Sequence, residues 1–136
     1  MRLMIDTNII LDVFLERMPF FPLSKKILSL CEERTIEGFV SASSITDIFY
    51  IVRKGLESSY EAYKVLGNIL NIVKVLNVTN NDVYKAYLAK AKDFEDCLLA
   101  VCCKANNCEG IVTRNRRDFE NFNIKIYSPE EILEIV

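Results

Sequence analysis

Short apolar segments alternate with longer helical segments along almost the whole chain. The short segments have strand character and are Arg2–Ile5, Phe39-Val40, Lys74–Asn77, Gly110–Thr113 and Ile124–Tyr127. Apolar residues at helical spacing predict helices over Asn8–Glu16, Leu23–Glu33, Ser44–Lys54, Ser59–Ile72, Asp82–Ala91, Phe94–Asn106 and Pro129–Val136. Strands that alternate with helices predict an α/β fold, a three-layer α/β/α arrangement with a central parallel sheet covered on both faces.

Several helix ends are predicted from their capping residues. We expect Ser43 or Ser44 to cap the third helix and Gly55 to end it, because glycine readily adopts the left-handed conformation found at helix ends. Asn80 or Asn81 is expected to cap the fifth helix. The 136 residues contain no linker-like or low-complexity stretch, so residues 1–136 are expected to form a single domain.

The composition restricts the chemistry. The chain has no histidine, which removes the commonest general base and with it Ser-His-Asp and Cys-His catalysis. Its five cysteines form no CxxC pair, and an odd number without a secretory signal favours reduced thiols and a cytoplasmic location. No apolar run is long enough to span a membrane. The net charge of −2 means that a nucleic-acid partner would need a local basic patch or bridging cations.

Acidic residues follow the predicted strands or open the helices after them. These acids are Asp6, Asp47, Asp93, Asp96 and Asp118. The carboxyl ends of parallel strands meet at one edge of the sheet, so we expect the five acids to lie there. The alternative is that each only caps a helix, because Asp93-x-x-Asp96 and Ser44-x-x-Asp47 both resemble capping boxes. Asp6 fits this alternative poorly, because the residues after it could cap the next helix.

Several carboxylates brought together without histidine would repel one another unless cations lie between them. Clusters of oxygen ligands suit Mg²⁺ or Mn²⁺ rather than zinc. Such ions can activate a water molecule and bind a phosphodiester. The sequence therefore predicts metal-dependent phosphoryl chemistry at this edge of the sheet. Asp12, on the helix after Asp6, is expected either to support the site or, by preference, to be merely exposed.

Four segments together resemble the PIN-domain family. In order along the chain they are MIDTNIILDVF, SSITDIFYIVRK, DFEDCLLAVCCKAN and IVTRNRRDFENFNIKIYSPEEIL. The chain looks most similar to single-domain prokaryotic members related to VapC-type toxins. This resemblance implies a Mg²⁺- or Mn²⁺-dependent ribonuclease that acts on single-stranded RNA. It also implies a homodimer and, for a toxin, an antitoxin protein that blocks the site.

The resemblance further implies roles for individual residues. The expected metal ligands are Asp6, Asp96, Asp93, Asp47 and Asp118, and all but Asp93 are also the expected catalytic residues. Asp47 stands where many relatives have glutamate, and Asn115 shares the fourth acidic position with Asp118. Residues expected to support the carboxylates are Asn8, Thr7, Thr113 and Asn115. Separately from the resemblance, the clustering of Arg114, Arg116 and Arg117 beside the same edge predicts that they bind RNA phosphates, with a solvated loop as the other interpretation.

Two other function classes are considered. The shorter side chain of Asp47 and the amide of Asn115 depart from the family pattern, which keeps a non-catalytic RNA- or protein-binding module as the alternative. An aspartyl-phosphate phosphatase would need a second acid where Asn8 stands. The tyrosine pairs Tyr60/Tyr63 and Tyr84/Tyr87 are expected in the core or in subunit contacts, where they could mark a dimer or antitoxin groove.

Overall fold

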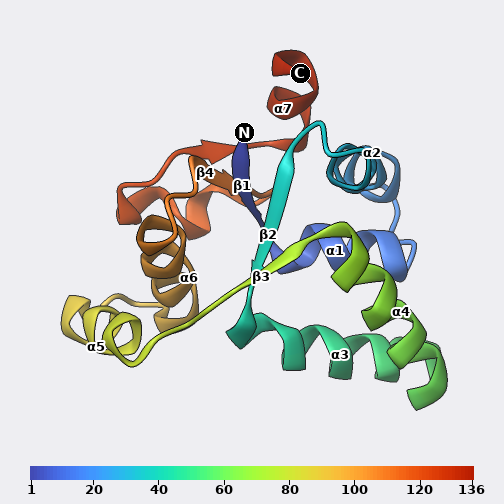
Figure 1. Cartoon of the computed structure of the whole chain (residues 1–136), viewed down its shortest axis with the longest axis horizontal. Coiled ribbons are helices and arrows are strands. Elements are labelled where there is room, and N and C mark those ends of the chain that lie inside the picture. Colours follow the sequence, from blue (N-terminus) through green and yellow to red (C-terminus); the bar gives the residue numbers. More distant parts are fainter.

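The computed structural model describes residues 1–136 as a five-stranded sheet between two layers of helices (Figure 1). The strands are β1 (Arg2–Ile5), β2 (Glu37–Ser41), β3 (Lys74–Leu76), β4 (Gly110–Val112) and β5 (Ile126–Tyr127). The helices are α1 (Thr7–Phe14), α2 (Phe21–Glu32), α3 (Ala42–Leu56), α4 (Ser59–Ile72), α5 (Asn80–Ala89), α6 (Phe94–Ala105) and α7 (Pro129–Ile135), with 3₁₀ turns η1 (Arg116–Asp118) and η2 (Glu120–Phe122). The longest helix, α3, has 15 residues, and none of the helices has both the length and the apolar character to cross a membrane.

All strands are parallel, in the order β3-β2-β1-β4-β5. The middle strand β1 pairs with β2 on one side and β4 on the other, so that Met4 lies opposite both Phe39 and Ile111. Helices cover both faces of such a sheet, which explains why Leu3, Met4 and Ile5 of the middle strand are apolar and buried. The predicted α/β/α fold is therefore confirmed.

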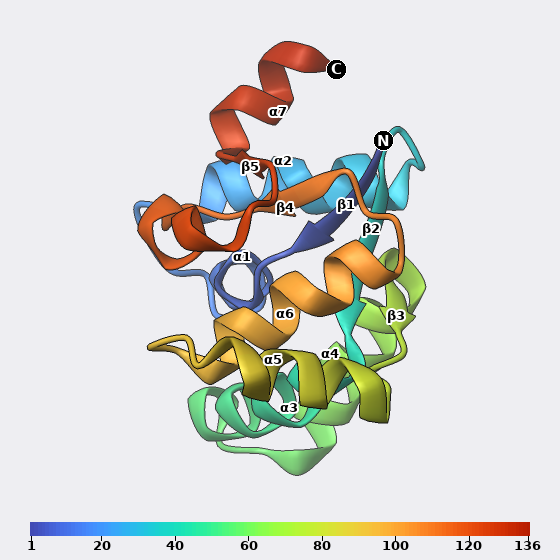
Figure 2. The ribbon, with the colours of Figure 1, turned by 90° about the vertical axis from the view of Figure 1, so that its left-hand side faces the viewer.

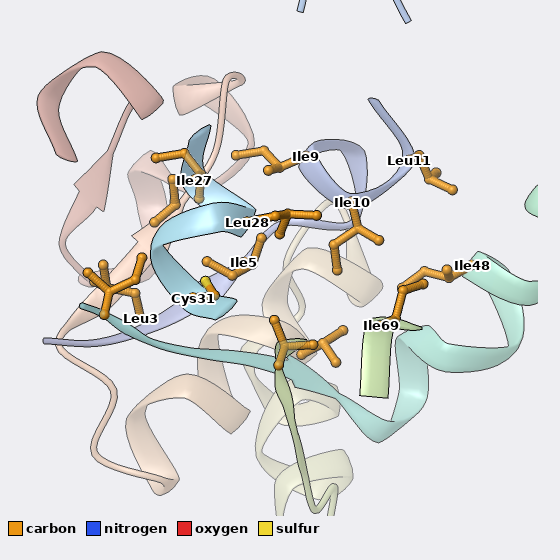
Figure 3. Close-up of a cluster of buried hydrophobic side chains, with 14 of the residues drawn as sticks. Leu3, Ile5, Ile9, Ile10, Leu11, Ile27, Leu28, Cys31, Ile48 and Ile69 are labelled. Carbon is orange, nitrogen blue, oxygen red and sulfur yellow. The ribbon is translucent and has the colours of Figure 1, made fainter. Parts of the chain in front are cut away.

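Side chains that alternate along β1 enter two different cores. Leu3 and Ile5 pack against α1, α2, α3 and α4 in the larger core (Figure 3). Met4 and Phe39 point to the other face, where they pack against Leu99 of α6. Helix α5 packs against α6, on the same side of the sheet (Figure 2). Each large side chain buried in this way stabilises the fold by about 1.5–3 kcal/mol.

The ends of α3 differ from the prediction. Gly55 does not end the helix, which continues to Leu56 and is followed by Glu57 in the left-handed conformation (φ 53°). A Cβ atom on Gly55 would lie 2.7 Å from Leu15 Cδ2, so the glycine allows close approach of two segments. The helix begins at Ala42, and the prediction that Ser43 or Ser44 caps it is wrong.

Helix α5 is capped by Thr79 rather than by Asn80 or Asn81. Thr79 Oγ1 accepts the backbone N–H of Asp82 at 3.1 Å, and Asp82 Oδ2 accepts the N–H of Thr79 at 3.0 Å. This reciprocal capping box satisfies two backbone donors at once, which a single asparagine cap cannot do.

Candidate active site

Asp6 follows β1 at the carboxyl edge of the sheet and is 7% exposed. Its backbone N–H donates to Val112 O at 3.0 Å, so the pairing of β1 with β4 continues past the strand. Asp6 occupies the N-cap position of α1, yet its side chain makes no capping hydrogen bond. Its Oδ2 instead accepts a hydrogen bond from Thr113 Oγ1 at 2.7 Å. Asp6 is therefore held by the end of the neighbouring strand.

Thr113 is fixed by hydrogen bonds from both its backbone and its side chain. Its N–H donates to Tyr127 O at 2.9 Å. Its side-chain oxygen accepts the backbone N–H of Asn115 at 3.0 Å, which leaves the hydroxyl proton for Asp6. Asn115 thus takes part through its backbone, and its amide side chain is exposed.

The surroundings of Asp6 shift its pKa in opposing directions. Burial raises the pKa of Asp6 above its ordinary value, against the effect of the hydrogen bond from Thr113. The negative charge of Asp118 raises this pKa further, whereas the positive charge of Arg114 lowers it. Asp118 is exposed and belongs to η1. Its charge therefore acts on Asp6 from a segment far away in the sequence.

Asp96 lies in the first turn of α6 and is half-buried. Burial raises its pKa to about 7. Four nearby carboxylates add to this effect: Asp93, Asp118, Asp6 and Glu95. Burial and the neighbouring acids therefore act in the same direction, and both favour the protonated form of Asp96. The structure brings acids from the ends of β1, α6 and η1 together at one edge of the sheet.

Asp93 does act as a helix cap. Its Oδ1 accepts the backbone N–H of Asp96 at 2.9 Å. The reciprocal bond that would complete a capping box, from the Asp93 N–H to the Asp96 side chain, is absent. The capping interpretation therefore holds for Asp93, while the carboxylate of Asp96 remains available to a ligand.

Asp47 lies at the margin of this group. It is exposed and stands in the second turn of α3, so the predicted first-turn position and the capping box with Ser44 are wrong. Its charge raises the pKa of Glu95 rather than that of Asp6 or Asp96.

Glu95 is a residue of the site that sequence reasoning missed. Burial raises its pKa, and the charges of Asp47, Asp93 and Asp6 raise it further. The signal for Glu95 was present in the run DFED, where it stands between two acids already considered.

The side chains after Asp6 do not hold a carboxylate. Thr7 is the first residue of α1. The side-chain oxygen of Asn8 lies 3.5 Å from the guanidinium of Arg17, and the expected hydrogen bond from Asn8 to a site carboxylate is absent. Among the expected supporting residues, only Thr113 donates a side-chain hydrogen bond to one of the acids.

Arg114 binds a buried carboxylate. Its Nε and Nη2 donate to Asp12 Oδ2 at 2.9 Å and Oδ1 at 3.1 Å, and Ser24 Oγ donates to Oδ2 at 3.0 Å. The guanidinium also lies over the ring of Phe20, 3.8 Å from its centroid. Asp12 is fully buried, so the expectation that it is merely exposed is wrong. A carboxylate in that environment requires a cation and hydrogen-bond donors.

The other two arginines differ from Arg114 and from each other. Arg116 donates to Glu131 Oε1 at 2.7 Å and to Ile126 O at 3.2 Å, which connects η1 to β5 and α7. Arg117 has no ion pair within the chain, and it is exposed.

A cavity of about 680 Å³ opens beside Asp96, between the α5–α6 connection, the start of α6 and η1–η2. Its acidic part is lined by Asp93, Asp96 and Asp118. Lys92 and Arg117 supply positive charge to the same cavity. The cavity thus joins the acids to two cations.

The chemistry of the acids suits a hard divalent cation. The side-chain ligand atoms are oxygens, and burial together with neighbouring acids raises the pKa values of Asp6, Asp96 and Glu95. No group of three or more His, Cys, Asp or Glu side chains is arranged to form a complete ion site. An ion here would therefore combine a few protein oxygens with water, as Mg²⁺ commonly does.

Solved structures share this fold, including the following two. A chain from a toxin–antitoxin complex of Klebsiella pneumoniae is 18% identical, with a TM-score of 0.67 over 93% of this chain and 97% of that one. VapC20 of Mycobacterium tuberculosis, a sarcin–ricin loop cleaving toxin, is 12% identical, with a TM-score of 0.62 over 80% of this chain and 86% of that one. No curated protein matches the sequence.

The family model of the PIN domain matches residues 2–117. This range contains β1 to β4, together with Asp6, Asp96 and Thr113, and ends one residue before Asp118. The resemblance carried by the four sequence segments is confirmed, and the chain belongs to the PIN domain family.

Proposed function

We propose that this protein is a divalent-metal-dependent ribonuclease that hydrolyses phosphodiester bonds of single-stranded RNA, and that it is the toxin of a toxin–antitoxin pair. The observation that carries the proposal is the convergence of acids from the ends of β1, α6 and η1 at one edge of the sheet, where Asp93, Asp96 and Asp118 line one cavity and where burial and the neighbouring acids raise the pKa of Asp96 to about 7. Membership of the PIN domain family supports it. So does the similarity in fold to a toxin that cleaves the sarcin–ricin loop.

In this proposal the acids bind the metal ion. Asp6 and Asp96 are the principal ligands, with Asp47, Asp93 and Asp118 as further or water-mediated ones. Mg²⁺ or Mn²⁺, when bound, supplies a water of lowered pKa and neutralises charge on the phosphate. Thr113 holds the Asp6 carboxylate in one orientation through its 2.7 Å hydrogen bond. Asp93 fixes the first turn of α6, which carries Asp96.

The arginines divide between structure and substrate. Arg117 has no partner within the chain and lines the cavity beside Asp96, so we assign it the RNA phosphate contact. Arg114 and Arg116 retain their ion pairs with Asp12 and Glu131 and contribute positive potential to the same edge.

The partners of the protein are part of the proposal. Four tyrosines on α4 and α5 are 55–73% exposed: Tyr60, Tyr63, Tyr84 and Tyr87. They do not pack in the core, which leaves subunit contacts, and we assign them to an antitoxin or to a second copy in a homodimer. One solved relative is a toxin–antitoxin complex. A cytoplasmic location is consistent with five free thiols.

The alternative is a non-catalytic PIN-fold module that binds RNA or protein. The absence of a complete ion site and the marginal position of Asp47 favour it. Such a module would bind RNA without producing cleavage products.

Labelled single-stranded RNA incubated with the protein and Mn²⁺ or Mg²⁺ separates the two functions. We expect cleavage that is lost in EDTA and in Asp96→Asn, and that is retained in Glu134→Gln, a change at an exposed acid on α7. RNA binding without metal-dependent products would contradict the ribonuclease proposal and favour the binding module.

A further inference from the structure

We propose that the cavity of about 680 Å³ beside Asp96 binds one unpaired nucleotide of the RNA, adjacent to the cleaved bond, and that Asn121 contacts its base. We call this cavity the nucleotide pocket and define it by Ala91, Lys92, Asp96, Arg117, Asn121 and Phe122. The inference rests on the proposed ribonuclease function and specifies its substrate. The volume lies in the range of pockets that enclose small ligands, about 300–1,000 Å³.

The nucleotide pocket offers two cations to a phosphodiester chain, beside the acidic part of the cavity that Asp93, Asp96 and Asp118 line. Lys92, in the connection between α5 and α6, and Arg117, in η1, come from different walls and are both exposed. Neither forms an ion pair within the chain. A nucleotide inside a strand is flanked by two phosphates, and two free cations on different walls can contact one each. Asp96, in the same cavity, places the candidate catalytic acids next to this nucleotide.

The apolar part of the nucleotide pocket matches the face of a base. Phe122 is half-buried and packs against Phe119 with ring centroids 6.4 Å apart, which fixes its position. Phe119 is itself in the core beneath the sheet. The other apolar residues that line the cavity, Ala89 and Ala91, have short side chains. Unpaired bases stack on aromatic side chains in this way, with little regard to base identity.

Asn121 supplies the group that could distinguish one base from another. It lies on η2, is exposed, and its amide forms no hydrogen bond within the chain. A side-chain amide offers both donors and an acceptor, which complement the edge of a base. Base edges in a duplex are occupied by pairing, so a concave pocket of this kind favours an unpaired strand.

Salt dependence of RNA binding tests the two cations directly. The probe is a fluorescent single-stranded RNA of random sequence, and its affinity is measured by anisotropy in Ca²⁺ over a range of salt. Each lost phosphate contact lowers the slope of log affinity against log salt by about 0.7. We expect this decrease in Lys92→Gln and in Arg117→Gln, and no decrease in Lys125→Gln, an exposed lysine outside the nucleotide pocket.

Base preference tests Asn121. A random single-stranded RNA pool is cleaved in Mn²⁺, and the ends of the products are sequenced. We expect Asn121→Ala to remove the base preference at one position next to the cut, while Asn71→Ala, at an exposed position of α4, retains it. An equal pattern in both variants would overturn the role of Asn121.

The outcomes separate the nucleotide pocket from the proposed function. Cleavage with unchanged salt slopes in Lys92→Gln and Arg117→Gln would overturn the pocket and leave the ribonuclease standing. Binding with the expected slopes but no cleavage would support the pocket and contradict the ribonuclease. Absence of any RNA binding would overturn both.

Discussion

Arg114 and Asp12 form a two-point ion pair between residues 102 positions apart in the sequence. The carboxylate is fully buried and the arginine side chain is 27% exposed. Arg114 directly follows Thr113, whose hydroxyl binds Asp6, so the ion pair anchors the turn that supports the site. The sequence pattern predicts that Arg114 binds RNA phosphates, whereas in the structure its guanidinium neutralises a buried carboxylate and stabilises the fold.

Replacement of Arg114 by methionine leaves Asp12 buried without its cation. We expect Arg114→Met to lower the free energy of unfolding by about 2–3 kcal/mol, less than for a fully buried pair because Arg114 is partly exposed. Urea denaturation followed by circular dichroism measures the change. The control is Arg117→Met, at an exposed arginine without an ion pair, where the change should stay within about 0.5 kcal/mol. Equal effects of the two substitutions would contradict the assignment.

The hydroxyl of Thr113 should matter more for metal binding than for folding. Thr113→Val removes the hydrogen bond to Asp6, and we expect it to weaken Mn²⁺ binding by about 10–100-fold, the range found when a ligand loses its supporting group. Thr113→Ser keeps the hydroxyl and should bind nearly as wild type. Isothermal titration calorimetry measures both variants, and equal loss in the two would contradict the role of the hydroxyl.

The raised pKa of Asp96 predicts a pH dependence of stability without metal. Between the ordinary pKa of 3.8 and about 7, the folded state retains a proton that the unfolded state releases. The free energy of unfolding therefore falls as pH rises through this window. Asp96→Asn removes the charge and should stabilise the metal-free protein at pH 8 by about 1 kcal/mol, a modest value because solvent screens a half-buried side chain. Thermal unfolding should show no such gain in Glu134→Gln.

Metal binding should carry the opposite pH dependence to stability. A cation binds the ionised form of Asp96, so binding releases a proton below its pKa of about 7. We expect Mn²⁺ affinity to rise as pH increases from 6 to 8 and then to level off. Calorimetry in two buffers of different ionisation enthalpy counts the released protons. A pH-independent affinity would show that Asp96 does not bind the ion.

Two glycines should respond oppositely to alanine. Gly67 lies in α4, and no heavy atom lies within 4 Å of the position that a Cβ atom would take there, so Gly67→Ala should stabilise the protein by about 0.5–1 kcal/mol. A Cβ atom on Gly110 would lie 2.6 Å from Lys125 O, the acceptor of a hydrogen bond between β4 and β5. Gly110→Ala should therefore destabilise by about 1–3 kcal/mol. Denaturation midpoints compare the pair, and a loss in both variants would contradict this account.

The fold could be predicted from the sequence because the apolar periodicity and the acidic residues at the strand ends indicate the same arrangement of strands and helices. The apolar run of β1 followed by Asp6 placed that carboxylate at the edge of the sheet. The position of Asp96 followed in the same way from the start of a buried helix. These inferences depend on local pattern alone, which is why they transfer from sequence to structure.

Other features of the site depend on contacts between distant segments. Asp12 pairs with Arg114 across 102 positions, and no local sequence pattern predicts that pair. Gly55 lies inside α3, where Leu15 approaches it closely, and this contact between distant segments cannot be predicted from the sequence of the helix. The roles of the acids toward metal stay predictions, because they concern a ligand rather than the chain.

The strand order has a consequence for biosynthesis. The half of the sheet formed by β1, β2 and β3 can assemble early, whereas Thr113 follows Asp6 by 107 residues and emerges from the ribosome later. A nascent chain therefore exposes Asp6 without the strand, the hydroxyl or the second carboxylate that accompany it in the finished protein. For the proposed ribonuclease, this order delays activity until β4, α6 and η1, which complete the site around Asp6, have been synthesised.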